Sequence, residues 1–180
     1  MKRADSWQTA EIPGPKKALV ITAPESIGEI VNRAKRPLLI VGKESANINL
    51  GKCTLIDYTI RIARKGKIPL VSTGNTLRQF VNQGYESAIL VNLSDIAHLL
   101  TDSNWLGLDG LGSYDLLLFI GIHYSFGWNV LSALKHFAKT ITVISLDRFY
   151  QPNATWSFPN LKPDEWIKSL TIIENKVKER

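Results

Sequence analysis

Short apolar runs alternate with amphipathic segments along most of this 180-residue chain, and this alternation limits its fold more than any other feature. Five runs have the length of strands buried on both faces: residues 38–41, 68–72, 87–91, 114–121 and 141–146. Between them, apolar residues recur at helical spacing, and Pro24 and Pro163 stand in the first turns of two predicted helices. Ser94 is expected to cap a further helix over 95–100. We therefore expect an α/β fold: a three-layer, doubly wound, Rossmann-like parallel sheet of about five to six strands.

Residues 1–23 differ from the rest because proline and glycine interrupt them and only 18–23 form an apolar stretch. We expect an extended N-terminal arm here, followed by a single domain over 24–180. Such an arm tends to lie on another surface, which makes Trp7, Ile12 and Pro13 candidates for partner contacts.

A second candidate for partner contacts is the glycine-rich segment before residue 114, which carries Trp105 and Leu108. These apolar residues, together with the arm, favour docking on a partner or self-association. The alternative is that they pack on the domain itself.

The residues that commonly hold metals or perform catalysis are few. Cys53 is the single cysteine, which excludes a disulfide framework and a [4Fe–4S] cluster held by this chain alone, since such a cluster needs about four cysteines. The three histidines have no zinc-like spacing, and no G-x-S-x-G motif is present. We expect no metal and no catalytic residues in this chain.

No secretory signal and no apolar stretch near the ~18–20 residues of a membrane span are visible, so a cytoplasmic protein without membrane contact is expected. The formal net charge of +6 is unevenly distributed: residues 1–66 hold 12 Lys and Arg against 6 Asp and Glu, whereas residues 67–180 hold 10 against 10. The basic pairs stand at predicted helix ends. This favours a face for an acidic partner or a phosphate-bearing cofactor over nucleic-acid binding.

Small and polar residues follow the predicted strands. Ligands of open parallel sheets bind outside the carboxyl ends of strands, so these residues are the candidates for a nucleotide cradle. They are Gly42, Ser72, Thr73, Gly74, Asn75, Gly121, His123 and Asp147. The alternative is plain turn geometry, because no G-x-G-x-x-G motif is present.

Three stretches carry a resemblance to a known family: A-E-I-P-G-P-K at 10–16, I-V-N-R-A-K-R-P-L-L-I-V-G at 30–42 and I-P-L-V-S-T-G at 68–74. They resemble the epsilon subunit of archaeal acetyl-CoA decarbonylase/synthase, an enzyme complex of one-carbon metabolism and methanogenesis. The last two stretches also resemble the middle domain of thiamine-diphosphate enzymes, which has the deoxyhypusine-synthase-like NAD/FAD-binding fold.

The resemblance implies a non-catalytic subunit that associates with the carbon monoxide dehydrogenase alpha subunit, two alpha with two epsilon. It also implies that the nickel and iron–sulfur centres belong to alpha, and that this chain stabilises alpha or assists electron transfer to FAD. Two other hypotheses remain: a stand-alone FAD- or NAD-binding module, and an NAD-dependent enzyme with His123 and Asp147 as its acid–base pair.

Overall fold

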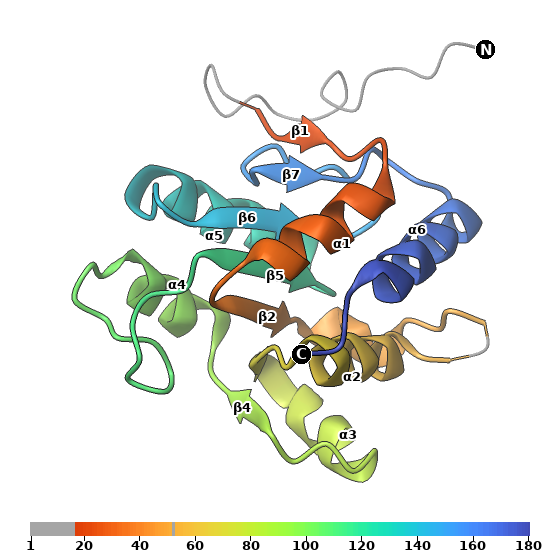
Figure 1. Cartoon of the computed structure of the whole chain (residues 1–180), viewed down its shortest axis with the longest axis horizontal. Coiled ribbons are helices and arrows are strands. Elements are labelled where there is room, and N and C mark those ends of the chain that lie inside the picture. The colour runs from red at the N-terminus through yellow and green to blue at the C-terminus, as the bar shows by residue number, and fades with distance from the viewer. Residues whose placement is uncertain (1–16, 52) are drawn as a thin grey trace.

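The computed structural model describes residues 17–51 and 53–180, in which helices cover both faces of a central sheet (Figure 1). The strands in this part of the chain are β1 (Leu19–Val20), β2 (Pro37–Val41), β3 (Leu70–Ser72), β4 (Ala88–Leu90), β5 (Leu116–Ile120), β6 (Thr142–Ser145) and β7 (Trp156–Ser157). The α-helices are α1 (Pro24–Arg33), α2 (Leu55–Gly66), α3 (Leu77–Asn82), α4 (Leu93–Thr101), α5 (Tyr124–Phe137) and α6 (Pro163–Lys176). Two short 3₁₀ helices, η2 (Lys43–Asn47) and η3 (Gly74–Thr76), follow β2 and β3.

The strand order is β1-β7-β6-β5-β2-β3-β4, and every neighbouring pair is parallel. From β2 the chain proceeds to β3 and β4 on one side, and from β5 to β6 and β7 on the other. The order therefore reverses between β2 and β5, which pair along their whole length from Pro37↔Leu116 to Val41↔Ile120. The predicted doubly wound parallel sheet is confirmed. The sheet has seven strands where about five to six were expected, because β1 and β7, of two residues each, are too short to stand out as apolar runs.

β1 places the start of the domain earlier than the expected boundary at residue 23. Its residues Leu19 and Val20 pair with β7, and Ile21 donates its backbone N–H to Ser157 O at 2.9 Å. Ala18 and Ile21 are buried against opposite faces of the sheet. Residues 18–21 are thus part of the folded sheet, while the rest of the expected arm up to residue 16 lies outside the described residues.

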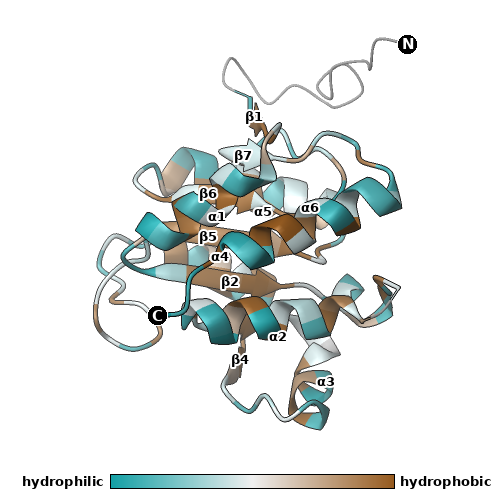
Figure 2. Ribbon diagram, turned by 45° about the vertical axis from the view of Figure 1, so that its right-hand side comes forward, coloured by the Kyte–Doolittle hydropathy of each residue, from teal (hydrophilic) through white to brown (hydrophobic). Residues whose placement is uncertain are grey.

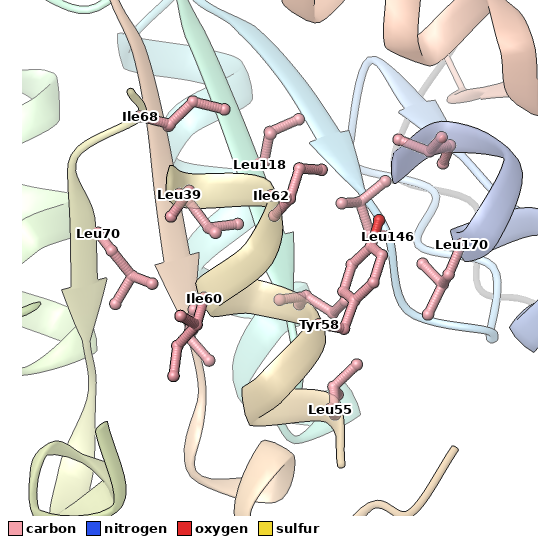
Figure 3. Packing of buried hydrophobic residues seen from close by; sticks show 14 of the residues in the cluster. Leu39, Leu55, Tyr58, Ile60, Ile62, Ile68, Leu70, Leu118, Leu146 and Leu170 are labelled. Carbon is pink, nitrogen blue, oxygen red and sulfur yellow. The ribbon is translucent and has the colours of Figure 1, made fainter. Parts of the chain in front are cut away.

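Two apolar clusters lie on the two faces of the sheet. Consecutive side chains of a strand point to opposite faces, so Leu39 and Val41 of β2 join the cluster beneath α1, α2 and α6, whereas Leu38 and Ile40 join the one beneath α4 and α5. Figure 3 shows the first cluster, with Tyr58 of α2 beside Leu146. Apolar colour concentrates in the strands and hydrophilic colour on the outer faces of the helices (Figure 2). Burial on both faces explains why each longer strand is a continuous apolar run.

The starts of α2 and α4 differ in what stabilises them. Thr54 caps α2: its hydroxyl accepts from Asp57 N at 3.2 Å, and the Asp57 carboxylate accepts from Thr54 N at 2.7 Å. The expected cap of α4 is wrong, because that helix begins at Leu93 with Asn92 as its N-cap, and Ser94 lies inside the first turn. Leu93 is buried, so packing of the helix face sets this start.

Candidate functional site

Two adjoining clefts lie outside the carboxyl ends of the strands, where the strand order reverses. We call the larger, about 450 Å³, the Asp147 cleft, and the smaller, about 310 Å³, the Lys43 cleft. The segments after β2 and β5 contribute to both, and Ile122 and His123 line both. Ligands of doubly wound folds bind at this place, because the loops diverge there and leave a crevice. The two clefts are therefore the candidate ligand sites.

Two of the glycines predicted to bind a cofactor, Gly42 and Gly121, pack against each other between the clefts. Gly42, after β2, has no room for a side chain, because a Cβ there would collide with the Gly121 carbonyl. Gly121, after β5, has φ +69°, and a Cβ there would collide with Ser45 Oγ. The Gly121 carbonyl accepts the Glu44 N–H at 2.9 Å. In dinucleotide-binding folds the first glycine turn receives the pyrophosphate. Here the Gly121 backbone packs directly against Gly42, so the two clefts are the space that a ligand can use.

Asp147 follows β6 and holds the Gly121 turn in place. Its Oδ1 accepts the Gly121 N–H at 2.7 Å, and its Oδ2 accepts the Ile122 N–H at 3.3 Å. Burial raises the pKa of Asp147 from 3.8 to about 7; the two backbone hydrogen bonds oppose this rise, and the Glu44 charge adds to it. Close to neutral pH the cleft therefore holds a carboxyl group that exchanges a proton.

The walls of the Asp147 cleft are mainly apolar and come from segments far apart in the sequence. Trp166 and Ile167 of α6 form one wall, and Ile48 and Leu50 form another. The Trp166 ring is fixed because its Nε1–H donates to Leu146 O at 2.7 Å. Phe149 lies beneath the Arg148 guanidinium, 4.2 Å from ring centroid to Cζ. The sequence marked the α6 residues only as an apolar helix face, so nothing in it distinguished a cleft wall from core.

The Lys43 cleft is lined by polar groups from the ends of four strands. Its residues are Gly42, Lys43, Thr73, Gly74, Asn92, Leu93, Ser94, Ile122, His123 and Phe126. Thr73 is held in place because its hydroxyl donates to Val41 O at 3.2 Å. Lys43 is the one residue in this lining with a permanent charge. A cleft of this composition suits an anion.

The predicted cofactor residues thus divide between the clefts. Gly42, Thr73, Gly74 and His123 line the Lys43 cleft, and Gly121, His123 and Asp147 line the Asp147 cleft. Asn75 belongs to η3, in the turn after β3. Ser72 lines neither cleft: it is fully buried, and its hydroxyl shares a 2.7 Å hydrogen bond with Thr76 Oγ1.

Two of the predicted partner-contact residues, Trp105 and Leu108, pack partly on their own domain. Trp105 packs on Tyr114 with ring centroids 5.8 Å apart, and the Leu108 N–H donates to Tyr114 Oη at 3.2 Å, so both are half-buried against their own domain. In the same loop Leu106 and Leu111 are 59% and 74% exposed. The other three predicted contacts, Trp7, Ile12 and Pro13, lie outside the described residues.

Within residues 17–51 and 53–180, no three His, Cys, Asp or Glu side chains gather as metal ligands would. None of the helices in the same residues combines the length and apolar character that a membrane span requires.

Comparison with known proteins gives one family. Residues 2–173 match the model of the CO dehydrogenase beta subunit/acetyl-CoA synthase epsilon subunit family. Three archaeal proteins named as epsilon subunits of the acetyl-CoA decarbonylase/synthase complex are similar along most of their length. The protein of Methanothrix soehngenii is 38% identical over 89% of this chain and 84% of its own. For Methanothermobacter thermautotrophicus the identity is 36% over 91% of both chains, and for Archaeoglobus fulgidus it is 34% over 89% and 84%.

Proposed function

Because the chain belongs to the CO dehydrogenase beta subunit/acetyl-CoA synthase epsilon subunit family, we propose that it binds and stabilises the carbon monoxide dehydrogenase alpha subunit as a non-catalytic partner. The observation that carries the proposal is the match over residues 2–173, together with relatives that are themselves named as subunits of a complex. The chain's single cysteine is consistent with metal clusters that belong to another subunit.

The exposed apolar residues of the loop before β5 support a docking role. Leu106 and Leu111 are large apolar residues that the same loop exposes, and binding residues often stand on loops that a rigid scaffold positions. Asp109, between these two leucines, forms an ion pair with Arg36, which holds the loop against the domain.

Anaerobic co-purification of the full chain with a carbon monoxide dehydrogenase alpha subunit tests this role. We expect the two to co-elute as two alpha with two epsilon, and alpha to lose activity more slowly on heating when this chain is present. Leu106→Asp should weaken the association, whereas Leu19→Asp, a change in β1 at a leucine of similar exposure (56% against 59%), should not. Separate elution of the two wild-type chains would refute the proposal.

A second function, FAD binding that supports electron transfer from CO oxidation, is favoured by one observation: two clefts adjoin at the switch point of the sheet. Bound FAD would supply a two-electron acceptor. Lys43 would be available to contact the phosphates of FAD, and Trp166 and Phe149 would be available to contact one of its rings.

Titration of the full chain with FAD, followed by flavin fluorescence and absorbance, tests the second function. We expect saturable binding that Ser94→Trp abolishes, because the indole would fill the Lys43 cleft from an exposed position on α4. Ser169→Trp on α6, away from both linings, is the matched control. No binding of FAD at millimolar concentration would exclude a stable site.

A further inference from the structure

The two clefts differ in charge. The Asp147 cleft is lined by the carboxyl groups of Glu44 and Asp147 and by the Arg148 guanidinium, so opposite charges offset one another there. The lining of the Lys43 cleft includes no carboxylate, carries the Lys43 ammonium, and adds the hydroxyls of Thr73 and Ser94. An anionic group is therefore attracted more strongly to the Lys43 cleft than to its neighbour.

Apolar side chains line both clefts, among them Leu93, Ile122 and Phe126 in the Lys43 cleft, but the apolar walls of the Asp147 cleft are more extensive. Ile48, Leu50, Trp166 and Ile167 give the Asp147 cleft aliphatic and aromatic walls. At its mouth Phe149 is exposed beneath the Arg148 guanidinium, an arrangement in which a flat ring gains both apolar contact and stacking. The Asp147 carboxyl, fixed by two backbone N–H groups, offers a hydrogen-bonding edge to such a ring.

The clefts are close enough to take one molecule. Ile122 and His123 belong to both linings, so both clefts border the single turn between β5 and α5. Each cleft alone is at the small end of the range for ligand sites, and together they lie well within it.

We infer that the ligand of this site spans the β5–α5 turn, with a planar aromatic ring in the Asp147 cleft and a phosphate against Lys43 in the other cleft. This inference rests on the ligand-binding part of the proposed function and is independent of association with alpha. It places the phosphate beside Lys43, on the side of the turn after β2 that adjoins Thr73 and Gly74, and not between Gly42 and Gly121, which pack on each other.

Two pairs of probes that differ by one phosphate test the assignment: FMN against riboflavin, and AMP against adenosine, each titrated into the full chain by calorimetry. We expect at least one phosphorylated probe to bind about tenfold more tightly than its partner, because a charge-assisted contact is lost with the phosphate. Lys43→Gln should abolish that difference. Lys35→Gln, an exposed lysine before the opposite end of β2, should preserve it.

Two substitutions in the Asp147 cleft test the proposed place of the aromatic ring. Ile167→Trp, or Ile48→Trp if the first lowers thermal stability, should fill the Asp147 cleft and weaken both members of the pair equally. If the phosphate adds no affinity, or Lys43→Gln leaves the difference intact, the two-cleft assignment is overturned while a ligand site remains. If FAD and all four probes fail to bind at millimolar concentration, the ligand-binding proposal itself fails and this inference with it.

Discussion

At the scale of single residues, Gly121 is the position where the site and the fold depend on each other. Its φ of +69° and its contact with Ser45 both require glycine. We expect Gly121→Ala to lower the free energy of unfolding by about 2–4 kcal/mol, because strain at a positive φ adds to overpacking. Chemical denaturation of the purified variant measures the change.

Gly84 provides the matched control for that substitution. It has nearly the same φ, +67°, but a Cβ there meets no atom within 4 Å. Gly84→Ala should therefore cost only the backbone strain, about 1 kcal/mol. Equal losses in the two variants would mean that the close approach at Gly121 contributes nothing.

Asp147 should make stability depend on pH. Burial raises its pKa from 3.8 to about 7, so between these values the folded chain holds a proton that the unfolded chain has released. The contribution of Asp147 is thus fully present below about pH 4 and is lost as the pH rises through about 7. We expect the free energy of unfolding to fall by roughly 2–4 kcal/mol from this group between pH 4 and pH 8.

The variant Asp147→Asn isolates that contribution, since asparagine does not titrate. Urea denaturation at pH 5 and pH 8 should show a smaller decrease for the variant than for the wild type. The two proteins share their other titrating groups, so the difference between them belongs to this position. Parallel pH profiles would contradict a raised pKa at Asp147.

At the scale of elements, two helix starts that look alike in sequence differ in the structure. Thr54 is hydrogen-bonded to the first turn of α2, whereas Ser94 lies inside α4, two residues after the N-cap Asn92. Thr54→Ala should lower the free energy of unfolding by about 1 kcal/mol, and Ser94→Ala should change it by less than about 0.5 kcal/mol. Thermal unfolding of both variants checks the pair, and an equal loss in both would refute the difference.

The same scale shows where reasoning from sequence succeeded. Each long apolar run became a strand and each amphipathic segment a helix, because a continuous apolar run and a helical repeat of apolar residues are both local patterns. β1 and β7 were not predicted because two residues are too few to form a recognisable pattern. They are defined by parallel pairing, of β1 with β7 and of β7 with β6.

At the scale of the whole molecule, the sheet joins segments from near both ends of the chain. β1 pairs with β7, and Ile21 is 4% exposed in the core beneath α1, whereas Leu19 is 56% exposed. We expect Ile21→Ala to lower the free energy of unfolding by about 2–4 kcal/mol and Leu19→Ala by less than about 0.5 kcal/mol. Chemical denaturation distinguishes the two, and a neutral Ile21→Ala would place residues 18–21 outside the cooperative domain.

The distribution of charge also has a whole-molecule explanation. Two basic residues, Lys65 and Arg180, hold helix ends: Lys65 Nζ donates to Glu174 O at 2.9 Å, and the Arg180 guanidinium donates to Val31 O and Ala34 O. Cations at these ends complement the helix dipoles. Part of the excess charge therefore stabilises the domain. Lys43, by contrast, follows the carboxyl end of β2 and lines the Lys43 cleft.

The sequence by itself determined the α/β alternation, the parallel sheet between two helical layers, and the set of small and polar residues that end the strands, since periodicity and turn chemistry are local properties of a chain. Only the tertiary structure decided that β2 and β5 adjoin, that Gly42 and Gly121 pack on each other, and that Trp166 forms a cleft wall. These are contacts between residues distant in sequence, and no local pattern specifies them. The raised pKa of Asp147 follows from the same contacts, because burial arises only when the strand ends come together.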